Sequence, residues 1–298
     1  MPNEFLCKEI RCRHWKRLLR RLWQTRKIKL LQARKHLNSN EIRLSVRSPK
    51  KASQYVTAGI DVRAADYLDV NSMVEAWRGT DVLIYIPSIS HPSIVRVPEF
   101  ENSVIAAERA GVKHFIFVGF FADQVNSPFH MAAFFAYANT RLASAGFSYS
   151  IIKNAMYADP LVPYLPELIE RKAVIYPMGN AKMSFISRED SAEAIVKLAM
   201  SPVLQGKTYV LTQERNYTML ELANILSEVS GHEIGYQPVT VEEFAAIYDQ
   251  PKGFGVVLAS LYQAGSQGCL DIVTDDFRTI TGRQATDLKS YMKKNYQK

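Results

Sequence analysis

Two strand-length runs dominated by apolar residues constrain the fold of this chain more than any other feature. The first is Val82–Pro87 (Val-Leu-Ile-Tyr-Ile-Pro), and the second is the Phe-Ile-Phe-Val segment within Lys113–Gly119. Such runs are typical of strands that are covered on both faces of a parallel sheet. Between them, Val97–Ala110 has helical spacing and is followed by Gly111, a residue that commonly ends helices. The order strand, helix, strand predicts a βαβ unit.

The same alternation continues along the chain and predicts an α/β fold with a doubly wound parallel sheet. Further predicted strands and helices are Gly59–Asp66, Asn71–Arg78, Met131–Ala145, Tyr149–Asn154 and Tyr209–Thr212. The proline-rich stretch Ala155–Glu167 is expected to begin a smaller α/β lobe over residues 155–298. In that lobe Ser187 is a predicted N-cap, and Thr218 with Glu221 predicts a capping box for a helix that Gly231 ends. The last helices are predicted around Val241–Tyr248, Phe254–Ala264 and Ala285–Asn295.

A strand that ends in a cluster of cations lies near the start of this pattern. Ile42, Leu44 and Val46 alternate as in a strand, and Arg47 and Lys51, with Lys50, crowd the following loop. At the carboxyl end of the second strand of a doubly wound sheet, an arginine can pair with the 2′-phosphate of a dinucleotide. The loop therefore predicts either an NADP clamp or a solvated basic surface.

The positive net charge of +8 comes from the N-terminal segment alone. Residues 1–51 hold 16 basic and three acidic residues, which leaves 21 of the 37 basic and 26 of the 29 acidic residues for the rest. No nucleic-acid binding is therefore expected of the core. Trp15–Trp23 has the spacing of a basic amphipathic helix, which could lie on a membrane or RNA, or serve as a presequence.

Several classes of protein are excluded by composition. Three cysteines are too few for a disulfide framework or a four-ligand zinc site, and no His, Cys or acid cluster has metal-ligand spacing. The Gly-x-Ser-x-Gly motif of α/β hydrolases is absent. No apolar run approaches the length of a membrane span, and the first ten residues lack the pattern of a secretory signal, so a cytoplasmic location is expected.

The order and spacing of many short motifs resemble one known family. The motifs are Asn40–Lys51, Gly79–Ser88, Ala106–His114, Ala143–Tyr149 and Gly206–Thr212. They resemble the NmrA-like branch of the atypical short-chain dehydrogenase/reductases, and within it the type 2 NAD(P)H:quinone oxidoreductases. The resemblance implies a Rossmann-like cofactor-binding core over residues 40–154 and a substrate lobe after it. It also implies NADP(H) rather than NAD(H), a quinone-like small-molecule acceptor, and a monomer or homodimer; the alternative is a non-catalytic redox sensor that binds NADP(H) and a protein partner.

The first 39 residues do not match this family. The resemblance implies a first strand and a turn of the form Gly-x-x-Gly-x-x-Gly before Asn40, where the backbone approaches the pyrophosphate. The chain has no glycine before Gly59. We hypothesise that residues 1–39 are read in a shifted frame, the alternative being a native basic arm, and that a chain without the phosphate loop is inactive. Inspection of the coding DNA tests this, because the hypothesis requires a glycine-rich turn in another frame.

By resemblance, the site residues lie where the core strands end. The predicted cofactor-binding residues are Arg47, Lys51, Asp66, Tyr67, Pro87, Ser88, Gly119, Phe120 and Asn154. The predicted acceptor-binding residues are Tyr85, His91, Phe121 and Tyr157, for which the alternative is a core or surface position. The candidate proton donors are His130, otherwise a solvated loop histidine, and Tyr137, otherwise a helix residue facing the pocket or core. Tyr137 lies in Tyr-Ala-Asn-Thr-Arg, where related reductases have Tyr-x-x-x-Lys, and arginine cannot relay a proton as lysine can.

Overall fold

The computed structural model describes residue 30 and residues 32–296. The predicted helix at Trp15–Trp23 lies outside the described residues. The core helices are α2 (Ser53–Thr57), α3 (Val70–Trp77), α4 (Ser93–Ala110), α5 (Ala132–Leu142) and α7 (Arg188–Met200). The remaining α-helices are α6 (Leu161–Arg171), α8 (Met219–Ser230), α9 (Val241–Ile247), α10 (Phe254–Ser266), α11 (Asp276–Thr281) and α12 (Leu288–Asn295). Short 3₁₀ helices cover Ser39–Glu41, Pro49–Ala52 and Pro202–Leu204.

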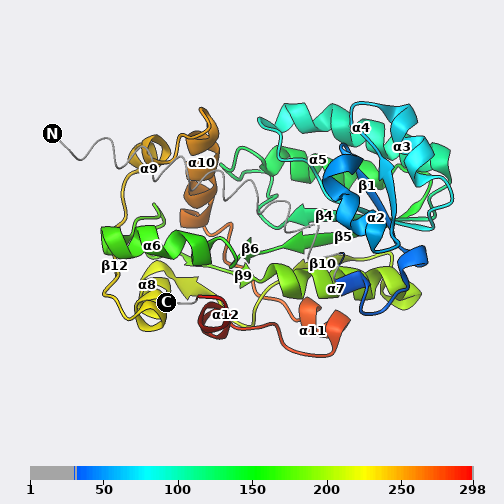
Figure 1. Ribbon diagram of the computed structural model, residues 1–298. Coiled ribbons are helices and arrows are strands. Elements are labelled where there is room, and N and C mark those ends of the chain that lie inside the picture. Colours follow the sequence, from blue (N-terminus) through cyan, green and yellow to red (C-terminus); the bar gives the residue numbers. More distant parts are fainter. Residues whose placement is uncertain (1–29, 31, 297–298) are drawn as a thin grey trace.

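The main sheet is parallel and has the strand order β10-β5-β4-β3. Its strands are β3 (Val82–Tyr85), β4 (His114–Phe120), β5 (Ser148–Asn154) and β10 (Thr208–Leu211). In Figure 1, α3, α4 and α5 lie along one side of this sheet, while α7 and α11 lie on the other. The predicted parallel α/β fold, with helices on both faces, is confirmed.

A second, two-stranded parallel sheet holds the basic loop. Its strands are β1 (Arg43–Val46) and β2 (Asp61–Ala64), with Arg43 opposite Asp61. They enclose a separate small hydrophobic core, here called the β1–β2 core, which consists of Leu30, Val46, Ala52, Tyr55 and Ile60. The apolar side chains of the main sheet belong to a different, much larger core.

The C-terminal lobe is built from α6, α8, α9, α10 and α12, which gather at one end of the main sheet in Figure 1. Its short strands form three pairs: β6 (Met156–Tyr157) with β9 (Phe185–Ile186), β7 (Ala173–Val174) with β12 (Gly235–Tyr236), and β8 (Lys182–Met183) with β11 (Tyr217–Thr218). Tyr176 and Tyr262 stack with ring centroids 4.2 Å apart in the centre of this lobe. Both rings are buried, so the lobe has a packed aromatic interior.

Two local expectations were wrong. The strand β3 was expected to be covered on both faces, but Val82, Leu83 and Ile84 are only half-buried, because β3 pairs with β4 and with no other described strand. The helix α4 begins at Ser93, four residues before the predicted start, and includes Pro98. The proline-rich stretch, which was expected to begin the second lobe, contains most of α6, since Pro163 falls in the first turn, where a missing N–H costs little, and the buried Leu165 and Leu168 anchor the rest.

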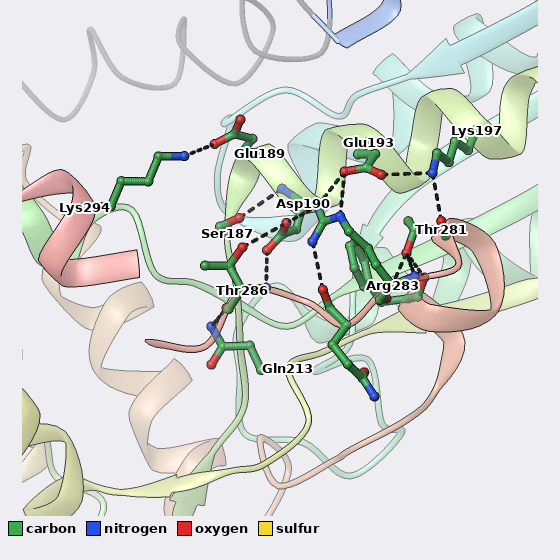
Figure 2. Close-up of polar contacts among 12 residues, drawn as sticks. Ser187, Glu189, Asp190, Glu193, Lys197, Gln213, Thr281, Arg283, Thr286 and Lys294 are labelled. Atoms are coloured by element: carbon green, nitrogen blue, oxygen red, sulfur yellow. Dashed lines mark hydrogen bonds and ion pairs between the residues drawn. The ribbon is translucent and has the colours of Figure 1, made fainter. Parts of the chain in front are cut away.

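A network of charged and polar side chains fixes the chain after α11 against α7 (Figure 2). The buried Asp190 carboxylate accepts the Arg283 guanidinium at 2.6 Å and the Thr286 backbone N–H at 2.9 Å. Arg283 also pairs with Glu193 at 2.5 Å, and the Ser187 hydroxyl accepts the Asp190 N–H at 2.9 Å, as predicted for the N-cap. The network therefore stabilises the face of the sheet opposite α4 and α5.

Candidate functional site

Two predicted site residues lie side by side where β4 and β5 end. Phe120 is opposite Asn154 in the parallel register. Asn154 is buried, donates its Nδ2 to the carbonyl of Gly119 at 3.3 Å, and accepts the hydroxyl of Ser191 at 2.6 Å. Gly119 has no room for a side chain, since a Cβ atom there would lie 2.9 Å from a ring carbon of Phe117. The strand ends are therefore tightly fixed, as a surface that positions a flat ring requires.

The aromatic residues predicted to wall the acceptor site fall into two groups. Phe120 is half-buried and contacts the rings of Phe121, Phe129 and Phe135, with centroids 5.2, 5.8 and 6.0 Å away. Tyr85 is separate from this group: it is fully buried and packs on Phe115 and Phe117. Phe120 thus presents an aromatic face at the strand ends, whereas Tyr85 lies in the core.

Tyr157 lies against a buried cation that the sequence did not reveal. The Arg188 guanidinium carbon is 5.2 Å from the centre of the Tyr157 ring, in the range of a cation–π contact. Arg188 is 7% exposed, and its Nε has no hydrogen-bond partner among the described residues. Its backbone N–H donates to Asp159 at 2.8 Å, and burial raises the pKa of that carboxyl. A buried guanidinium of this kind is suited to hold an anionic oxygen.

The sequence contains one local signal for Arg188, which is its position at the start of a helix. Arg188 is the first residue of α7, between the N-cap Ser187 and the acids of the first turn, where a basic residue opposes the helix dipole. A cation at that position is unusual on local grounds. It could have been singled out for that reason.

Of the two candidate proton donors, Tyr137 has its hydroxyl engaged. It donates to Glu101, and Arg141 contacts the same carboxylate at 2.9 Å. Burial, and then the hydrogen bond to Glu101, raises the pKa of Tyr137. Its role therefore stays a prediction.

His130 and His91 belong to loops that meet α10. The side chain of His130 is exposed, while its backbone N–H donates to the Ser260 hydroxyl at 3.1 Å and its carbonyl accepts from Ser93. The ring of His91 lies edge-on to Phe254 at 5.8 Å. The loops before α4 and α5 and the helix α10 therefore form one rim beyond the strand ends, and both histidines stay predictions.

The predicted cofactor residues near β1 and β2 lie apart from Phe120. Arg47 and Lys51 are exposed and take part in none of the ion pairs between described residues; Lys51 lies in the 3₁₀ helix Pro49–Ala52. Asp66 accepts the Leu68 N–H at 3.1 Å, as a turn residue does. The Tyr67 hydroxyl donates to the carbonyl of Ile86 at 2.8 Å and so joins the end of β2 to the end of β3.

The loop after β3 is held by one buried carboxylate. Glu99 accepts the hydroxyl of Ser88, and also that of Ser90 at 3.0 Å. Pro87 is half-buried beside Ser88. The loop predicted to border the cofactor is therefore fixed to the first half of α4.

A cavity of about 630 Å³ lies elsewhere, between α8 and the start of α12. Its lining combines charged residues, among them Arg215, Glu221 and Lys289, with the apolar Ile225 and Ala285, and includes none of the predicted site residues. Among residues 30 and 32–296 there is no group of three or more His, Cys, Asp or Glu that could hold a metal ion. No helix within the described part of the chain is long and apolar enough to cross a membrane.

The residues present fit the two ends of a dinucleotide better than its middle. Arg47 and Lys51 offer free positive charge at one end, and the Gly119 and Phe120 strand end offers a flat surface at the other. Residues 1–58 contain no glycine, so the close backbone approach that a pyrophosphate needs has no glycine from this part of the chain.

Comparison with known proteins identifies relatives along most of the chain. The model of the NmrA-like family matches residues 29–267. Quinone oxidoreductase 2 of Escherichia coli is 30% identical over 251 residues, which cover 83% of this chain and 85% of that protein. Its crystal structure in complex with NADPH matches with a TM-score of 0.84 and covers 90% of this chain and 95% of that one.

Two further solved structures match equally well. A chain from Staphylococcus aureus, described as a nucleoside-diphosphate-sugar epimerase, is 44% identical with a TM-score of 0.84, over 88% of this chain and 95% of that one. Triphenylmethane reductase of Citrobacter sp., in complex with NADP(H), is 28% identical with a TM-score of 0.84, over 90% and 95% of the two chains. With its doubly wound sheet and these relatives, the chain belongs to the NmrA-like family.

Proposed function

We propose that this chain is an NAD(P)H-dependent oxidoreductase that transfers hydride from NADPH to a quinone or a similar flat electrophile. The observation that carries the proposal is the fixed strand end at Gly119, Phe120 and Asn154, in a chain similar to an NADPH-bound quinone oxidoreductase. When bound, the dinucleotide supplies the hydride. The protein supplies the surfaces that align the two flat rings.

In this proposal the charged residues act at the two ends of the site. Arg47, with Lys51 beside it, holds the 2′-phosphate, which is why we favour NADPH over NADH. Arg188 lies beside Tyr157 and stabilises the negative charge that an acceptor oxygen gains as hydride arrives. The acceptor anion then takes its proton from water or from a nearby donor.

The state of Tyr137 supports a reductase of electrophiles over chemistry that needs a strong general acid. Its hydroxyl is bound to Glu101 and its pKa is raised, so it is a poor proton donor near neutral pH. Reduction of a quinone does not depend on such a donor, because the product anion is stable enough to be protonated later. Epimerase-type chemistry on a sugar alcohol does require proton transfer from a positioned group.

The test is to mix the purified full-length chain with NADPH and to add 1,4-benzoquinone, a naphthoquinone or a triphenylmethane dye in separate assays. Oxidation is followed as the loss of NADPH absorbance, and for the dye also as the loss of its colour. Cofactor binding is measured separately by calorimetry. Binding with turnover of at least one acceptor is expected if residues 1–39 are the native segment; on the shifted-frame hypothesis, the same result is expected of the chain in which the native reading frame and its glycine-rich turn are restored. Binding without turnover across the panel would favour the redox-sensor alternative, and absence of both would refute the proposal.

A further inference from the structure

Arg188 is a buried arginine whose positive charge is not paired within the described part of the chain. It is 7% exposed, and arginines with so little exposure are almost always paired. Its Nε has no hydrogen-bond partner, and neither Nη group hydrogen-bonds to a described residue. The nearby Asp159 accepts the backbone N–H of Arg188 at 2.8 Å, but it forms no ion pair with the guanidinium. The guanidinium therefore has N–H donors available for a ligand.

The position of Arg188 in α7 concentrates positive charge. Arg188 is the first residue of the helix, where free backbone N–H groups carry partial positive charge and an acid is favoured. The two acids of that turn are engaged elsewhere, since Asp190 pairs with Arg283 at 2.6 Å and Glu189 with Lys294 at 3.3 Å. A buried cation beside a helix N-terminus favours an anionic group of a ligand.

The ring of Tyr157 fixes the plane of the guanidinium. The guanidinium carbon of Arg188 lies 5.2 Å from the centre of that ring. Tyr157 is itself opposite Ile186 in the pairing of β6 with β9, two residues before Arg188, so both groups are held by the backbone. A planar fork in a fixed orientation favours a flat ligand with two adjacent oxygens, since each oxygen can accept a separate N–H.

Arg188 lies close to the strand ends of the proposed acceptor site. Ser191, one turn further along α7, donates its hydroxyl to Asn154 at 2.6 Å, and Asn154 is opposite Phe120. Arg188 and Ser191 are three positions apart and so lie near each other on the helix surface. The start of α7 is therefore at the carboxyl edge of the parallel sheet, which is the edge where such sheets bind their ligands.

We infer that Arg188 binds two adjacent oxygens of a flat acceptor, so that the preferred acceptors are 1,2-quinones and not 1,4-quinones. This inference rests on the proposed reductase function. A 1,2-quinone offers both oxygens to the two Nη groups of Arg188 at once, whereas a 1,4-quinone offers one. The dione takes up a hydride from NADPH, that is two electrons and one proton, and the resulting catechol monoanion takes a second proton from water. The negative charge that develops is shared by two oxygens that both accept from Arg188.

The first test measures binding without NADPH and so does not depend on turnover. The probe is tropolone, a flat ring with two adjacent oxygens, and the comparison ligand is pentafluorophenol, a flat ring with one oxygen; both are anions at pH 8. Calorimetry with the full-length chain should show at least about tenfold tighter binding of tropolone, the effect of one further charge-assisted hydrogen bond. Equal affinities, or binding of neither ligand, would overturn the inference.

Substitutions of Arg188 locate the binding. Arg188→Lys keeps the charge but loses the fork, so it should weaken tropolone binding about tenfold and pentafluorophenol binding by less than about threefold. Arg188→Met should abolish binding of both ligands.

Arg215→Lys is the matched control for these variants. Arg215 also lies over a tyrosine ring, 4.6 Å from the centre of Tyr217, but it is exposed and paired with Glu221. Its substitution should leave both affinities unchanged. Circular dichroism confirms folding, and the lysine variant of Arg188 decides if the methionine variant does not fold. Equal losses from Arg188→Lys and Arg215→Lys would contradict the assignment.

A second test separates this inference from the reductase function itself. The isomers 1,2-naphthoquinone and 1,4-naphthoquinone have the same composition, and the ratio of their kcat/KM values is compared between the wild-type chain and Arg188→Lys, which cancels their different intrinsic reactivity. The ratio should fall about tenfold in the variant. An unchanged ratio with turnover of both isomers would overturn the inference and leave the reductase function standing. Tropolone binding that depends on Arg188, with no turnover of either isomer with or without the restored glycine-rich turn, would support the oxygen-pair site and refute the reductase function.

Discussion

The hydroxyl of Tyr137 donates a hydrogen bond to Glu101, a residue 36 positions earlier on the neighbouring helix. Arg141 binds the same carboxylate from the next turn of α5. The spacing that in related reductases joins a tyrosine to a lysine therefore serves here to fix α5 to α4. These contacts give Tyr137 a structural role that does not require a role in catalysis.

Replacing Tyr137 by phenylalanine is expected to change kcat/KM for NADPH-dependent quinone reduction by less than about threefold, since loss of a general acid typically costs a factor of about 10² to 10⁴. The free energy of unfolding should fall by about 1 kcal/mol, because one hydrogen bond is lost while Arg141 still pairs with Glu101. Steady-state kinetics and urea denaturation provide the two values. A loss of activity of a hundredfold or more would assign Tyr137 to catalysis.

Replacing Arg47 by alanine is expected to weaken NADPH binding by about tenfold to a hundredfold and to leave NADH binding unchanged, because only NADPH carries the 2′-phosphate that a charge-assisted hydrogen bond would hold. Arg109→Ala is a matched control, since Arg109 is also an exposed arginine but lies in the last turn of α4. Calorimetric titration with each dinucleotide gives the affinities. An equal loss for both dinucleotides, or for both variants, would contradict the assignment.

Replacing Asp190 by asparagine should lower the free energy of unfolding by about 2 kcal/mol, the usual range for hydrogen bonds to a charged group. The loss stays below that of a fully buried pair, because Arg283 is 42% exposed and keeps Glu193 as a partner. Glu189→Gln is the control: its ion pair with Lys294 is exposed and should contribute less than about 1 kcal/mol. Chemical denaturation at pH 7 compares the free energies of unfolding of the two variants. Equal losses would show that the network in Figure 2 does not anchor the segment after α11.

The stability of the chain should include an acid-sensitive contribution from Glu193. Partial burial acts to raise the pKa of Glu193, but hydrogen bonds from Arg283 and Lys197 outweigh it and lower that pKa. A carboxyl with a lowered pKa in the folded state stabilises the protein above its ordinary value of about 4.3, and this contribution is lost as pH falls through the folded pKa. The wild-type chain should therefore be more stable than Glu193→Gln at pH 7, and the difference should shrink steadily from pH 5 to pH 3. Urea midpoints across this range test the sign; a difference that grows on acidification would be inconsistent with it.

Local signals in the sequence were enough to place most elements. The N-cap at Ser187 and the capping box of Thr218 and Glu221 were both confirmed, since each depends on residues three positions apart. The strands β4 and β5 were also predicted within a residue or two: β4 holds the continuous apolar run Phe115–Val118, which has few alternatives in a parallel sheet, and β5 is centred on the β-branched pair Ile151 and Ile152.

The features that the sequence did not predict depend on contacts between residues far apart in the chain. Nothing near Tyr137 indicates that Glu101 will bind its hydroxyl. The place of Arg188 at the start of α7 is unusual for a cation, but it does not indicate that the guanidinium will be buried against Tyr157. The separation of β1 and β2 from the main sheet likewise depends on which strands pair with one another, and no local pattern of either strand encodes that pairing among the described residues.

Arg43 donates hydrogen bonds to the carbonyl of Arg78 and the hydroxyl of Thr80, and these contacts bear on the order in which parts of the molecule unfold. Because the β1–β2 core is small and is attached to the turn before β3 by this arginine and by the bond from Trp77 to Ser45, it is expected to open as a cooperative unit before the main core does. The loop that carries Arg47 would open with it. Within the part of the chain that the structure describes, mild protease treatment should therefore cut first between residues 43 and 64, and should leave the part from β3 onward as a folded fragment.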